Sequence, residues 1–230
     1  MVKKSFSLEE LEVHVMADTE ARNGVEIELA ERLLNQYLTG FTKLGKFTLD
    51  RINEREYAWF LLTVRSFSSL RCAFDILERG YYSQAALLTR SVLEDWLTAT
   101  DADKNRKTVE AVIKGEYEFG KGELSYSDVF KRLQKYPDTW GMVQLALSTI
   151  AYSRRLAPGM TITADKKHLM LGQYDVRLFQ AAYQVLLVAI VGMLEVMRKL
   201  LGVKGAEWWT VTQPIIESAN AEVAHLSRKA

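Results

Sequence analysis

The sequence holds a single cysteine, Cys72, among its 230 residues. One thiol excludes an internal disulfide framework and a zinc site built from several cysteines, and it is typical of a protein kept in a reducing compartment. We predict that Cys72 is buried in the core. Proline is almost as rare, with copies at Pro137, Pro158 and Pro214 only, and this scarcity favours long uninterrupted helices.

Two further absences limit the partners. Thirty basic and 29 acidic residues leave a net charge of +1, so no overall field favours nucleic acid or an anionic membrane, although a local patch stays open. The longest apolar run, Val185 to Leu194, has ten residues, whereas a transmembrane helix needs about 20. Near the N-terminus, the acidic residues between Leu8 and Glu12 interrupt any signal-peptide apolar region. We therefore expect a cytoplasmic protein with no membrane segment.

Motifs for cofactors and metals are also missing. The sequence has neither a Gly-x-Gly-x-x-Gly turn nor a Walker loop, the motifs that hold nucleotide phosphates. Glu222 and His225 have the spacing of a di-metal helix, but such a site needs a second pair and two more glutamates. No second Glu-x-x-His occurs. The prediction is therefore a chain that uses no cofactor and no metal.

Helical patterns dominate the chain, with apolar residues at spacings of three and four and little strand-like alternation. We predict an all-α protein, a single domain over residues 1–230 that forms a bundle of about seven or eight helices. Ser7 and Glu10 have capping-box spacing at the start of a short first helix, and Gly24 ends this helix or the turn that follows it. Other helical patterns cover residues 25–40, 55–79, 81–100, 104–119, 127–135, 139–155, 175–201 and 214–228, and Pro214 suits a first turn.

The segment 55–79 has the clearest apolar stripe. An apolar residue recurs every three or four positions, at Tyr57, Phe60, Val64, Phe67, Leu70, Phe74 and Leu77. Gly80 follows directly, and the segment 81–100 comes next. A turn this short folds two helices back on each other. We therefore expect an antiparallel hairpin, which forms the centre of the bundle together with the segment 175–201.

Residues 154–173 do not fit the helical pattern. They contain Pro158 and Gly159 and end near the basic cluster of Lys166, Lys167 and His168. Compact domains rarely keep a loop of this length unless it folds onto a site or moves for a purpose. A functional loop and a solvated connection are equal alternatives here.

Two charged residues lie within an otherwise apolar helical segment. Arg90 and Glu94 belong to the run from Ala85 to Leu97, which is apolar in nearly every direction around a helix. Four residues apart, they share a face, so the guanidinium reaches the carboxylate. Neither charge is stable alone in a low-dielectric interior. We expect them to be paired or to face a cavity.

The preceding helix supplies more charge to this region. Arg71 is seven residues from Val64 and so near the predicted stripe. If the hairpin forms, Arg71 and Arg65 project toward Glu94 or Asp95 and create a buried polar cluster. Such a cluster either fixes the register of the helices or recognises a small anionic ligand through the fork of Arg90. The sequence leaves both interpretations open.

The segment from Gly80 to Glu94 (GYYSQAALLTRSVLE) resembles the central signature of bacterial helical families of unknown function. In these families a helix that ends in glycine precedes a helix with an Arg-Ser-x-x-Glu pattern, and the resemblance covers about forty residues, 61–100. Such families are grouped loosely with HEPN-like proteins, many of which are ribonucleases of toxin and phage-defence systems with an Arg-x4-6-His motif. None of His14, His168 and His225 has an arginine at that spacing.

Two functions follow from these observations. The first is a non-catalytic binding or regulatory module in bacterial stress or phage defence. Its simplest partner is a second copy of the chain, in a homodimer formed through exposed faces of the long helices. It predicts an apolar surface patch without a polar cavity. The second is a HEPN-like nuclease or other hydrolase with Arg90 and Glu94 in its site and His168 reaching in from the long loop. It predicts an open polar cleft. Whether the chain is an enzyme stays open at this point.

Overall fold

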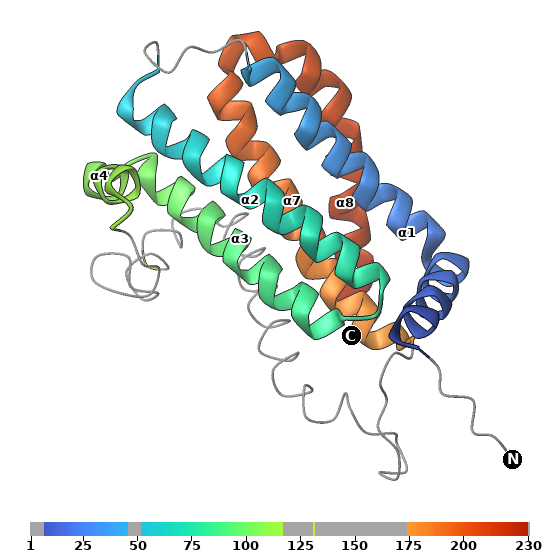
Figure 1. Ribbon diagram of the computed structural model, residues 1–230. Coiled ribbons are helices and arrows are strands. Elements are labelled where there is room, and N and C mark those ends of the chain that lie inside the picture. The colour runs from blue at the N-terminus through green and yellow to red at the C-terminus, as the bar shows by residue number, and fades with distance from the viewer. Residues whose placement is uncertain (1–6, 46–51, 117–130, 132–173, 230) are drawn as a thin grey trace, which may run out of the picture.

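The computed structural model describes residues 7–45, 52–116, 131 and 174–229 (Figure 1). Within these ranges every regular element is a helix, which confirms the all-α prediction. The helices are α1 (Leu8–Leu44), α2 (Glu54–Glu78), α3 (Tyr82–Ala102), α4 (Arg106–Lys114), α7 (Val176–Leu201), the short 3-10 helix η3 (Gly202–Gly205) and α8 (Ala206–Lys229). The described ranges thus hold fewer helices than we predicted. The helices expected at 127–135 and 139–155 lie outside them, apart from residue 131.

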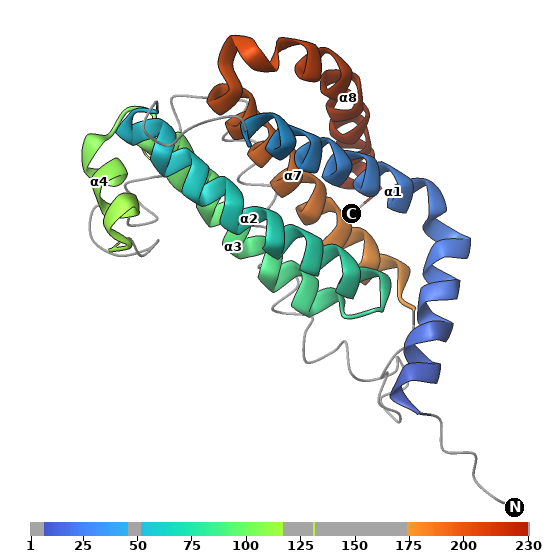
Figure 2. The same ribbon diagram turned by 45° about the horizontal axis from the view of Figure 1, so that its top comes forward.

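Helix α1 joins two segments that we predicted to be separate helices. It starts with the expected capping box, in which the Glu10 N–H donates to Ser7 Oγ at 3.1 Å. It then continues past Gly24, with a kink at Asn23, whose backbone angles are non-helical (φ −134°, ψ 30°). The Asn23 amide donates to the Thr19 carbonyl at 3.1 Å, so an acceptor at the kink is satisfied. Figure 2 shows the first part of α1 bending away from the other helices.

Helices α2 and α3 lie side by side and are joined by residues 79–81 (Figures 1 and 2). At Gly80 φ is +85°, a conformation that favours glycine, and a Cβ would lie 2.7 Å from Val15 Cγ1. Trp59 Nε1 donates to the Ala99 carbonyl at 2.9 Å. The turn at Gly80 and this bond near the other end hold the two helices together along their length.

The buried face of α2 differs from the predicted stripe. Its buried side chains are Ala58, Trp59, Leu62, Thr63, Ser66, Leu70, Ala73, Phe74 and Leu77. Val64, in the predicted stripe, is 43% exposed, and Cys72 is exposed, so the prediction of a buried thiol was wrong. Small side chains let helices approach closely, and several face the interior here. A stripe drawn through the large residues alone is therefore rotated from the true one.

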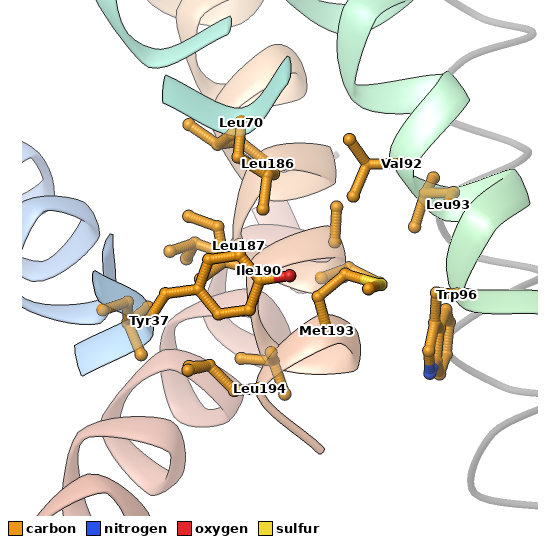
Figure 3. Close-up of a cluster of buried hydrophobic side chains, with 14 of the residues drawn as sticks. Tyr37, Leu70, Val92, Leu93, Trp96, Leu186, Leu187, Ile190, Met193 and Leu194 are labelled. Atoms are coloured by element: carbon orange, nitrogen blue, oxygen red, sulfur yellow. The ribbon is translucent and has the colours of Figure 1, made fainter. Parts of the chain in front are cut away.

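Helix α7 is the core element. It packs against α1, α2, α3 and α8, and nearly all of its side chains from Phe179 to Leu194 are buried. Figure 3 shows Leu186, Leu187, Ile190, Met193 and Leu194 between Tyr37 of α1, Leu70 of α2 and the α3 residues Val92, Leu93 and Trp96. Despite this long apolar run, none of the described helices is both long and apolar enough to cross a bilayer.

Helix α8 begins eight residues earlier than expected, so Pro214 lies inside it rather than in its first turn. A proline at this position cannot donate to the carbonyl of Thr210. Both Thr210 and Pro214 are exposed, so the interruption lies on the solvent side of α8. Trp208 anchors the start of α8, because its Nε1 donates to the Gln36 carbonyl of α1 at 2.9 Å.

Candidate functional site

A buried carboxylate links α2 and α3. The Asp95 side chain is 2% exposed. The Arg65 guanidinium donates to both of its oxygens, from Nε to Oδ2 at 3.0 Å and from Nη2 to Oδ1. The hydroxyl of Ser66 donates to the same Oδ2 at 2.9 Å. This arrangement neutralises the charge and supplies the hydrogen bonds that a buried carboxylate requires. The polar contact that we predicted for Arg65 across the two helices is therefore present.

The second predicted pair lies on α3 itself. Arg90 Nε donates to Glu94 Oε1 at 3.0 Å, and the two side chains are 25% and 27% exposed. The pair is thus partly buried at the edge of the helix packing, not enclosed in the core. A guanidinium and a carboxylate at such an edge are able either to hold the helix surface in place or to meet a solute.

Arg71 and His168 do not join these pairs among the described residues. Arg71 contacts Asp75 on its own helix at 3.0 Å, and its side chain is 54% exposed. The prediction that it faces the buried cluster was wrong, because Arg71 shares a face with Val64, and that face is the exposed one. His168 and the predicted loop 154–173 lie outside the described residues.

A third polar cluster, at the end of the α2–α3 pair, was missed by the sequence analysis. Asp103 follows α3 and accepts a hydrogen bond from Lys199 Nζ of α7 at 3.0 Å, while Arg55 Nη1 of α2 lies 3.5 Å from its other oxygen. The same two cations lie over the Trp59 ring, with Arg55 at 5.1 Å and Lys199 at 5.8 Å from its centroid. The cluster joins three helices, and no sequence pattern reveals it because its members are far apart in the chain.

A fourth cluster fastens α1 to the turn between α2 and α3. Glu12 accepts hydrogen bonds from Arg79 Nη1 and the Tyr81 hydroxyl, both at 2.7 Å. The bond from Tyr81 and then that from Arg79 lower the pKa of Glu12 below its ordinary value, and the same contact raises the pKa of Tyr81. The carboxylate is therefore ionised at neutral pH.

An apolar groove of about 290 Å³ lies where α1, α2 and α7 meet. Its lining consists of Phe41, Leu44, Gly45, Ile52, Phe60, Val64 and Leu200, without a charged side chain. An aromatic cluster lies beside it, in which the rings of Tyr37, Phe41 and Phe67 are 5.3 Å to 5.5 Å apart. Packed aromatic walls and an absence of charge suit the apolar side chains of a protein partner.

Neither a metal site in the described part of the chain nor a similar protein points to a function. The described ranges contain no group of three or more His, Cys, Asp or Glu side chains placed to hold a metal ion. Comparison of the chain with protein-family models, curated proteins and solved structures finds no match.

Proposed function

We propose that the chain is a non-catalytic binding module, and that its apolar groove receives apolar side chains from a second copy of the chain. The groove carries the proposal. Val64 lines it and is 43% exposed, and the other lining side chains are apolar as well. An apolar hollow with an exposed apolar rim is typical of an interaction surface.

A second copy fits this groove because the same face carries both the hollow and apolar side chains able to enter one. Leu38 of α1 is 49% exposed. It lies three residues from Phe41, so it is adjacent to the groove wall on the helix surface. A twofold symmetric interface requires one surface patch to be complementary to itself. A groove bordered by Leu38 and Val64 meets this requirement.

In this proposal α2 and α3 form an antiparallel hairpin that keeps the groove rigid. Two contacts support the antiparallel direction. Trp59 precedes Arg65 along α2, whereas their partners follow the reverse order along α3, because Ala99 comes after Asp95. The polar residues at the hairpin then have a structural role. The biological setting that the resemblance implies, bacterial stress or phage defence, belongs to the proposal as well.

The test is sedimentation velocity over a range of concentrations for the wild type and two variants. Val64→Glu places a charge in the groove wall. Leu87→Glu is the matched control, since Leu87 is 52% exposed on α3 and does not line the groove. We expect the wild type and Leu87→Glu to dimerise and Val64→Glu to remain monomeric. A monomeric wild type, or equal self-association of all three proteins, would contradict the proposal.

The second candidate is a HEPN-like nuclease or other hydrolase with Arg90 and Glu94 at its site. The partial exposure of the pair, about a quarter of each side chain, favours it, because a solute or small anionic ligand would reach the guanidinium. In this case Arg90→Ala abolishes cleavage of RNA while the free energy of unfolding falls by no more than about 1 kcal/mol, since a pair that solvent still reaches contributes little to stability. Wild-type protein that leaves RNA intact would remove the nuclease form of this candidate.

A further inference from the structure

The first part of α1 is held by fewer buried side chains than the rest of the helix. We term residues 8–22 the arm. Two of its side chains are buried, Val15 and Thr19, whereas the part from Asn23 to Leu44 buries Asn23, Ile27, Ala30, Leu33, Leu34, Tyr37, Gly40 and Leu44. Since burial of apolar surface supplies most of the stability of a helix in a protein, the arm is the weakly attached part.

The arm contacts the α2–α3 turn through two neighbouring features. Glu12 is bonded to Arg79 and Tyr81, at the surface. One turn further, Val15 packs against Gly80 so closely that a Cβ there would lie 2.7 Å from it. One polar contact and one apolar contact thus fasten the middle of the arm to this turn, and at the end of the arm the Arg22 guanidinium lies over the Tyr174 ring, 5.1 Å from its centroid.

The kink in α1 lies where the arm joins the rest of the helix. Asn23 has non-helical backbone angles, and its side-chain amide bonds both the Thr19 carbonyl, at 3.1 Å, and the Tyr174 hydroxyl, at 3.0 Å. Gly24 follows, and a Cβ at this position would meet nothing within 4 Å. The helical backbone geometry is therefore already broken at residue 23, and residue 24 is an exposed glycine with open space where a Cβ would lie.

We propose that the arm is a hinged strap, which leaves the α2–α3 turn as one unit about Asn23 and Gly24 while residues 25–44 stay packed. Regions with few buried contacts open locally at lower free energy than the whole protein. Opening uncovers the surface around Gly80 that Val15 covers. The strap lies at the opposite end of α1 from the apolar groove, so this inference does not depend on the proposed function.

Hydrogen exchange followed by mass spectrometry tests the strap in the full chain. In the wild type we expect the amides of residues 11–22 to exchange faster than those of residues 27–44. Glu12→Ala should accelerate exchange in the arm alone, by about tenfold, the change expected when a charge-assisted hydrogen bond is lost. Glu9→Ala is the matched control, because Glu9 is an exposed glutamate of the same arm; loss of its first-turn charge should accelerate exchange only about twofold.

Two results would overturn the strap. The first is equal exchange throughout residues 11–44 of the wild type, which needs no variant and shows that α1 opens as one unit. The second is a Glu12→Ala protein with native circular dichroism in which both parts of α1 accelerate equally.

Discussion

The two members of the Arg65–Asp95 pair differ sharply in exposure, since the Asp95 side chain is 2% exposed and that of Arg65 is 55% exposed. Loss of Arg65 leaves a buried carboxylate without its bidentate cation, whereas loss of Asp95 leaves an arginine that water hydrates. We therefore expect Arg65→Ala to lower the free energy of unfolding by about 3 kcal/mol and Asp95→Asn by about half of that. Urea unfolding of both variants checks this order, and a larger loss for Asp95→Asn would contradict it.

The contact of Glu12 predicts a dependence of stability on pH. Because folding lowers the pKa of Glu12, the resulting stability is present above the pKa of the unfolded chain, about 4.3, and is lost as the pH falls through the lower folded value. Wild type and Glu12→Gln should therefore differ in urea midpoint at pH 6 and converge toward pH 3. A difference that stays constant over this range would show that the charge of Glu12 has no role.

Local spacing explains which charged contacts were predictable. Arg90 and Glu94 are one helical turn apart, so the sequence alone predicted their pairing. Arg65 was expected to reach Asp95 because the two segments were expected to fold together. The contact of Glu12 with Arg79 joins residues 67 positions apart, and only the path of the folded chain brings them together.

At the scale of helices, two glycines offer a matched comparison. A Cβ at Gly24 of α1 meets nothing within 4 Å, whereas at Gly192 of α7 it would lie 2.6 Å from the Trp96 indole. Gly24→Ala should therefore stabilise by up to about 1 kcal/mol through helix propensity, and Gly192→Ala should destabilise by about 1–3 kcal/mol through overpacking. Thermal unfolding decides the sign of each change, and a stabilised Gly192→Ala protein would show that α3 and α7 do not approach as closely as described.

The existence of the helices was more predictable than their ends and faces. The spacing of apolar residues located α2, α3 and α7, but Gly24 and Pro214 were read as helix boundaries and lie within α1 and α8. A buried Asn23 amide and an exposed proline make these interruptions tolerable, and neither condition is visible in one sequence. The face of α2 was misjudged for a related reason, since burial there follows close packing of small side chains.

At the scale of the whole molecule, α7 packs against α1, α2, α3 and α8. Helix α1 extends from the α2–α3 turn, which Glu12 contacts, to the groove, which Phe41 and Leu44 line. The apolar groove arises where α1, α2 and α7 meet, and it combines residues between 41 and 64 with Leu200, which is far away in the chain. A surface of this kind has no sequence motif. Only the general expectation of an apolar patch for a binding module could be stated in advance.

The single cysteine allows the most direct measurement of the proposed self-association. Cys72 is exposed, and along α2 it lies about 12 Å from Val64 at 1.5 Å per residue. A spin label there gives one label per chain, so dipolar coupling arises only between copies. We predict a defined distance in the labelled wild type that disappears in Val64→Glu and persists in Leu87→Glu. Absence of coupling in the wild type, or coupling unchanged by Val64→Glu, would contradict an interface built on the groove.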